Sequence, residues 1–120
     1  MGLNRIDTEF MEKMNVIITE SIANEEFSID RLAEQLNMSR SSFYRKITAI
    51  TGMTPSDYLK NYRLNYAATL IADGCRISEV SDRVGFASSY FARCFKEKFG
   101  MLPSEYAQMQ STAGRAENRQ

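Results

Sequence analysis

The chain has 120 residues, of which 43% are hydrophobic and 25% charged, and its 15 basic side chains balance its 15 acidic ones. This length suits one globular domain. No apolar run approaches the ~18 residues of a membrane span, and residues 1–5 lack the apolar run that is typical of a signal peptide. Because histidine is absent and only Cys75 and Cys94 could act as thiols, the composition argues against zinc sites and His-based catalysis, and we expect a cytoplasmic non-enzyme without metal or cofactor.

The first predicted helix is acidic. It begins at Asp7 or Thr8 as N-cap and ends near Asn24, and residues 1–6 are expected to be disordered. Its inward stripe consists of Phe10, Met14, Ile17, Ile18 and Ile22. Residues 1–34 hold eight acids against three bases, a net charge of −5, whereas the remainder carries +5. This asymmetry predicts a basic face that can meet nucleic acid and an acidic face turned away from it.

The next two helices are separated by a sharp turn. Ser28 can cap a helix that carries Ile29 to Leu36, Asn37 tolerates positive φ at the turn, and Ser39 opens a second helix. That second helix runs to about Thr51 and ends at Gly52, a residue type favoured just past a helix end. Such a pair is the helix-turn-helix pattern, whose second helix can enter a DNA major groove.

The outward face of that second helix carries the candidate DNA contacts. Since Phe43 and Ile47 point inward by helical spacing, we predict that Arg45 reads a base, because its guanidinium can bridge guanine O6 and N7. The other candidates on this helix are Arg40, Ser41, Ser42, Tyr44 and Lys46. The two basic side chains among them, Arg40 and Lys46, are expected to hold phosphates. The alternative is that Arg45 is a solvated surface residue or an intramolecular ion-pair partner.

A long helix follows, with Thr54 as N-cap and Pro55 in its first position. It is predicted to run to about Asp73 and is apolar on almost every side, which is typical of a helix buried between other elements. Its roughly eighteen residues span ~27 Å, so we predict a rod that sets two reading helices near one ~34 Å turn of DNA apart. Its tyrosines could alternatively line a ligand cavity or form a stacking surface.

The segment from Gly74 onward repeats the earlier one at a spacing of 48 residues without a gap. Nine positions are identical in the repeat: Ile77, Ser89, Phe91, Arg93, Gly100, Met101, Pro103, Ser104 and Tyr106. Gly85 falls on Asn37, so both turns carry a residue that accepts positive φ. A second helix-turn-helix in register is strong evidence for the first.

The second reading helix is predicted over Ser88 to Phe99. Its candidate DNA contacts are Ser88, Ser89, Tyr90, Arg93 and Lys96. Arg93 corresponds to Arg45 and is expected to read a base, while Lys96 is expected to hold a phosphate, with Lys98 as a further candidate. A short closing helix is predicted to end near Met109, and residues 110–120 are expected to form a disordered tail because they lack apolar periodicity.

These residues resemble the DNA-binding domain of AraC/XylS-type transcriptional regulators. The resemblance rests on Val84-Gly85-Phe86, Tyr90-Phe91-Ala92-Arg93-Cys94-Phe95-Lys96 and Gly100-Met101-Leu102-Pro103-Ser104-Glu105-Tyr106. It implies an all-α fold of about seven helices, in which a first unit (about 7–53) and a second (about 75–109) are joined by a linker helix (55–73) in one domain (7–109). The chain departs from the family pattern in two ways. Ser81 stands where the family usually has Ala, and the turn between Phe86 and Phe91 is one residue shorter than in many relatives.

The family resemblance implies sequence-specific binding of a double-stranded DNA operator, activation of transcription with RNA polymerase as partner, and a nucleoid-associated location in a bacterial cytoplasm. The first reading helix looks like those at the carboxy end of hybrid two-component regulators, so a sensing or receiver domain is expected elsewhere in the parent protein. No membrane partner is expected. The alternative is a helical protein-interaction module that has lost DNA binding.

Overall fold

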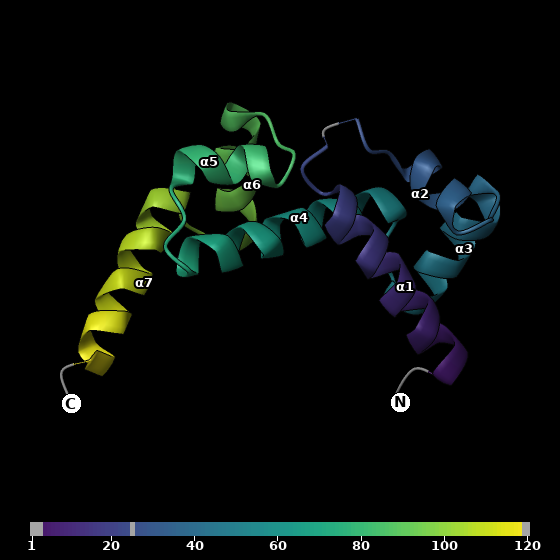
Figure 1. Ribbon diagram of the computed structural model, residues 1–120, viewed down its shortest axis with the longest axis horizontal. Coiled ribbons are helices and arrows are strands. Elements are labelled where there is room, and N and C mark those ends of the chain that lie inside the picture. The colour runs from purple at the N-terminus through teal and green to yellow at the C-terminus, as the bar shows by residue number, and fades with distance from the viewer. Residues whose placement is uncertain (1–3, 25, 119–120) are drawn as a thin grey trace. The chain divides into compact units, whose positions relative to one another are not determined.

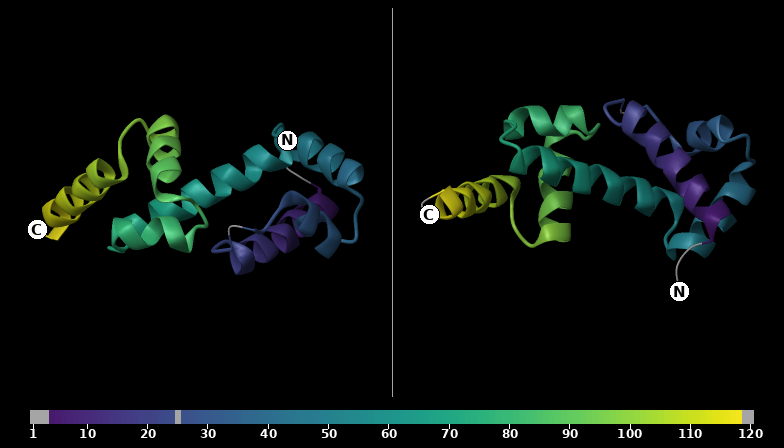
Figure 2. Two further views of the ribbon diagram at one scale, coloured as in Figure 1. Left: turned by 90° about the horizontal axis from the view of Figure 1, so that it is seen from above. Right: turned by 60° about the horizontal axis from the view of Figure 1, so that its bottom comes forward.

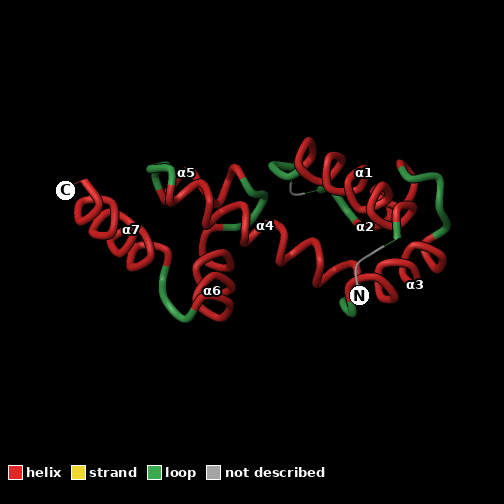
Figure 3. The backbone as a smooth tube through the Cα atoms, turned by 90° about the horizontal axis from the view of Figure 1, so that it is seen from below, coloured by secondary structure: helices red, strands yellow, loops and turns green. Residues whose placement is uncertain are grey.

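The computed structural model describes residues 4–24 and 26–118, and the elements in these residues are all helical (Figures 1 and 3). The helices are α1 (Arg5–Ser21), α2 (Ile29–Gln35), α3 (Arg40–Thr51), α4 (Pro55–Ala72), α5 (Ile77–Arg83), α6 (Ser88–Phe99) and α7 (Pro103–Asn118). The predicted all-α class with about seven helices is confirmed. None of the described helices is long and apolar enough to cross a lipid bilayer.

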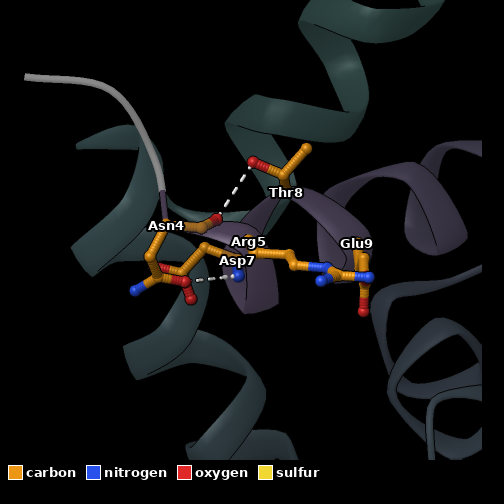
Figure 4. A network of polar contacts seen from close by, with 5 residues as sticks. All are labelled: Asn4, Arg5, Asp7, Thr8 and Glu9. Atoms are coloured by element: carbon orange, nitrogen blue, oxygen red, sulfur yellow. Dashed lines mark hydrogen bonds and ion pairs between the residues drawn. The ribbon is translucent and has the colours of Figure 1, made fainter.

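The first helix begins earlier than predicted, because Asn4 caps it (Figure 4). The Asn4 side-chain oxygen accepts a hydrogen bond from the backbone N–H of Asp7 at 2.8 Å, and the Asn4 carbonyl accepts one from the Thr8 hydroxyl at 3.0 Å. An ion pair between Arg5 Nε and Glu9 Oε1 at 3.2 Å spans the first turn. Asp7 and Thr8 therefore lie inside α1, and the expected disorder is wrong for residues 4–6; residues 1–3 lie outside the described ones.

Two compact units divide the chain, and the boundary falls inside α4, between Asn61 and Tyr62. The first unit contains α1, α2, α3 and the start of α4, and the second contains the rest of α4, then α5, α6 and α7. Both units therefore have the same helix order, and α4, which is continuous in every view, contributes to both (Figure 2). In this order α1 has the place in the first unit that the later part of α4 has in the second.

The turns of both helix-turn-helix pairs have the backbone geometry that the sequence predicted. Asn37 adopts φ 57° and Gly85 φ 77°, the left-handed region that few other residue types tolerate. In the first unit the Ser39 hydroxyl accepts a hydrogen bond from the backbone N–H of Ser42 at 3.2 Å, which caps α3. In the second unit Ala87 takes the capping position of α6 without a side-chain hydrogen bond.

Each unit has its own core beneath its reading helix. In the first, Phe43 (1% exposed) and Ile47 are buried together with residues of α1, α2 and α4, among them Met14, Ile18, Leu32 and Leu59. In the second, Phe91 and Phe95 are buried against residues of α4 and α5, among them Leu64, Ala67, Ile71, Val80 and Val84. The Phe95 ring lies 4.5 Å from Phe99 and 5.5 Å from Tyr106, centroid to centroid. Phe95 and Phe99 belong to α6, so the contact with Tyr106 is the one that packs α7 against α6 in the second unit.

The closing helix is longer than predicted. It was expected to end near Met109, but α7 continues to Asn118. Residues 110–118 are therefore helical rather than disordered, while residues 119–120 lie outside the described ones. The last apolar side chain of the predicted stripe, Met109, therefore did not mark the end of the helix.

Truncation of the buried phenylalanines should destabilise each unit. Phe43→Ala and Phe91→Ala remove equivalent rings from the two cores, and each should lower the free energy of unfolding by about 3–5 kcal/mol through the cavity left behind. Urea denaturation monitored by circular dichroism measures this change. Tyr44→Ala, on the exposed side of α3, is the matched control and should change stability by less than about 1 kcal/mol; a Phe43→Ala effect as small as the control's would contradict the assigned packing.

Candidate nucleic-acid interface

The exposed face of α3 carries four of its six predicted contacts. Arg40, Ser41, Tyr44 and Arg45 are exposed, Tyr44 by 48%. Phe43 and Ile47 on the opposite face are buried, so the helix can turn only this side outward. The described residues give Arg45 no hydrogen bond, ion pair or ring contact. Its five donors are therefore available to an outside acceptor.

The other two predicted contacts of α3 are half-buried, and two of its basic side chains have partners within the unit. Ser42 lies in the first turn, where its backbone N–H meets the Ser39 hydroxyl. The Lys46 ammonium lies 4.5 Å from the centre of the Phe10 ring, and Arg40 Nε lies 3.4 Å from Asp30 Oδ1. The intramolecular ion pair that the sequence allowed for Arg45 is therefore formed by Arg40. Because both members are solvent-exposed, this pair contributes only ~0–1 kcal/mol and can exchange for a phosphate.

All five predicted contacts on α6 are exposed: Ser88, Ser89, Tyr90, Arg93 and Lys96. The shorter turn does not bury Arg93, because Phe91 and Phe95 occupy the core below and fix the rotation of the helix. The sequence reading missed one contact, in which the Arg93 guanidinium carbon lies 5.2 Å from the centre of the Tyr90 ring. Residues three apart on a helix are neighbours, so the spacing of an aromatic and an arginine could have predicted it.

A recess of about 470 Å³ lies beside α6 in the second unit. Its lining comes from α5, α6 and the start of α7: Ile77, Ser78, Ser81, Ser88, Phe91, Ala92, Leu102, Pro103 and Ser104. The buried Ser81 hydroxyl lies 3.4 Å from that of Ser88. In the first unit the positions matching Ser78, Ser88 and Ala92 hold the larger Asp30, Arg40 and Tyr44. The two reading helices therefore present different surfaces around the same arginine.

A buried arginine supports the second unit and was also missed. Arg63 on α4 is only 6% exposed, and its Nη1 donates a hydrogen bond to the backbone carbonyl of Val84. Val84 is the C-cap of α5, so this bond ties α4 to the turn that leads into α6. The sequence did not single out Arg63, because Lys60 is a second basic residue of the same helix.

The geometry defines the class of domain: two helix-turn-helix units, each with an exposed arginine at the same place on its second helix. A protein-family model described as a helix-turn-helix domain matches residues 32–109. The chain belongs to this family in its AraC/XylS-type form, the DNA-binding domains of transcriptional regulators.

The chain is similar to the following three proteins, one compared by sequence and two by structure. Histidine kinase P4 of Formosa agariphila is 36% identical over 106 residues, which make up 87% of this chain but 8% of the kinase. The C-terminal domain of the two-component response regulator yesN from Fusobacterium nucleatum matches with a TM-score of 0.73 and 27% identity, over 82% of this chain and 98% of that one. The DNA-binding domain of AdpA, a global transcriptional factor solved with a target DNA, matches with a TM-score of 0.74 and 27% identity. This match covers 92% of this chain and 96% of the AdpA domain.

Replacement of the buried arginine should weaken the second unit. Arg63→Met keeps much of the volume but removes the charged donor from the Val84 carbonyl, and it should lower the free energy of unfolding by about 1.5–3 kcal/mol. Lys96→Met, an exposed position of the same unit, is the control and should stay within about 0.5 kcal/mol of the parent. Urea denaturation compares the two variants, and an Arg63→Met domain as stable as the control would show that the bond contributes nothing.

Proposed function

We propose that this domain regulates transcription by placing α3 and α6 in successive major grooves of one double-stranded DNA operator. The observation that carries the proposal is the repeated arginine: Arg45 and Arg93 are both exposed, and a phenylalanine two residues before each is buried below. A fork of donors on a helix that can enter the groove matches guanine O6 and N7.

In the proposed complex, the remaining side chains divide between bases and backbone. Ser41, Tyr44, Ser88 and Ser89 flank the two arginines and reach base edges or sugars. Arg40, Lys46 and Lys96 hold phosphates, which requires Arg40 to leave Asp30 and Lys46 to leave Phe10. Both contacts are weak enough at the surface to be exchanged. Ser42, which is half-buried, and Tyr90, which is exposed, are the remaining predicted contacts on the two helices.

The spacing of the two half-sites follows from the DNA. Helices that enter successive major grooves on one side of the duplex lie ~34 Å apart along its axis. The two proposed reading helices are connected through the 18 residues of α4. We propose that one copy of the domain contacts both grooves.

The wider role is proposed from the relatives. This chain is similar to 8% of the length of one histidine kinase, and it resembles the C-terminal domain of a response regulator. We therefore propose that it is the output domain of a larger two-component protein in a bacterial cytoplasm, associated with the nucleoid. A sensing or receiver domain elsewhere in that protein controls it, and RNA polymerase is the partner that it brings to a promoter as an activator.

The proposal is tested by selecting bound duplexes from a random pool of about thirty base pairs at moderate salt. Two enriched blocks centred about ten base pairs apart are expected, one for each reading helix. A single block would mean that only one helix reads bases. No enrichment, together with a tight protein partner, would replace the proposal with the protein-interaction alternative.

Substitutions of the arginines proposed to contact bases and of a lysine proposed to contact phosphates should have different effects on DNA binding. Arg45→Ala should weaken binding to the selected site by about 1–3 kcal/mol and relax preference at one base position of one block, and Arg93→Ala should do so in the other. Lys96→Ala should weaken all sequences alike and reduce the slope of log K against log salt by about one. Fluorescence anisotropy on preferred and random duplexes measures both; an Arg45→Ala variant that weakens the two duplexes equally would remove that residue from base readout.

A further inference from the structure

Three side chains of the second unit lie in sequence from the core to the reading face. Phe86 is buried, at 6% exposed, and its ring lies 5.8 Å from that of Phe91. The Tyr90 ring lies 5.7 Å from Phe86, centroid to centroid, and is 42% exposed. The Arg93 guanidinium carbon then lies 5.2 Å from the centre of the Tyr90 ring. Tyr90 thus has one contact with a buried core ring and another with the exposed arginine.

The first unit has no equivalent of this arrangement. The positions that match Phe86, Tyr90 and Arg93 hold Met38, Ser42 and Arg45. A serine side chain offers no ring to a guanidinium, and the described residues give Arg45 no contact partner. The repeat therefore keeps the same arginine in both copies but supports it in only one.

Resting on the proposed function, we infer that Tyr90 is a positioning residue that orients Arg93 for base readout. Bidentate contact with guanine requires one orientation of a planar fork, and an unrestrained arginine loses much rotamer freedom when it adopts that orientation. The guanidinium above Tyr90 has lost part of this freedom before DNA arrives, so less is lost on binding. Arg93 consequently discriminates its base more sharply than the side chain alone allows.

Two substitutions separate this role from a direct contact of Tyr90 with DNA. Tyr90→Ser installs the residue of the matched position in the first unit, and Tyr90→Phe keeps the ring but removes the hydroxyl. The readout is a ratio: affinity for the selected duplex divided by affinity for the same duplex with the base read by Arg93 replaced. That base is the one whose preference Arg93→Ala abolishes, and the base assigned to Arg45 in the same way is the internal control.

We expect Tyr90→Ser to lower this ratio about 2–5-fold, the size of an exposed cation–π contact, and Tyr90→Phe to stay within about twofold of the parent. The ratio at the Arg45 base should not change in either variant. A Tyr90→Ser domain with an unchanged ratio at the Arg93 base would overturn the inference. So would a Tyr90→Phe domain that loses as much as Tyr90→Ser, because the hydroxyl rather than the ring would then be responsible.

A second experiment tests the same inference without DNA. Nitrogen-15 relaxation of the arginine Nε–H groups in the free domain should show Arg93 more ordered than Arg45, with that order lost in Tyr90→Ser and kept in Tyr90→Phe. Equal mobility of the two arginines in the parent overturns the inference. If Arg93 is ordered as expected but the parent selects no sequence, the proposed function is overturned instead, so the two failures are distinguishable.

Discussion

The burial of a phenylalanine under each reading helix is the constraint on which the rest of the structure depends. Helical spacing places Phe43 and Ile47, or Phe91 and Phe95, on one side of the helix, and their packing fixes how that helix is rotated. Once the rotation is fixed, the residue two positions after the first phenylalanine must face solvent. The apolar core thus determines the direction of a polar side chain that it never contacts.

The same constraint explains why an identical arginine has different surroundings in the two units. Core positions agree closely across the 48-residue repeat, whereas the neighbours of the arginine on the reading face do not: Tyr44 is matched by Ala92, and Ser42 by Tyr90. Surface positions can vary because their substitution changes stability little. Each unit can therefore acquire its own base preference on a common framework, which is the property expected of a domain that reads two different half-sites.

Features governed by local periodicity and turn chemistry could be predicted from the sequence, as the positive φ of Asn37 and Gly85 and the Ser39 cap demonstrate. The start of α1 was misplaced because Asn4, Asp7 and Thr8 are all good caps, and only the backbone geometry decides among them. The end of α7 was misplaced because apolar periodicity stops near Met109, whereas the helix continues to Asn118. The tertiary bond from Arg63 to Val84 joins residues 21 positions apart, and no local pattern encodes such a contact.

The position of the unit boundary within α4 has a consequence for how the protein folds. Two cores that are separate in composition share one run of backbone hydrogen bonds on either side of Asn61 and Tyr62. Forming a helix is cooperative, because its first turn is unfavourable and each later residue extends it at little expense. A unit that has formed its part of α4 therefore supplies the other with a helix already nucleated, so the two halves of this duplicated chain are coupled in folding even though each buries its own aromatic core.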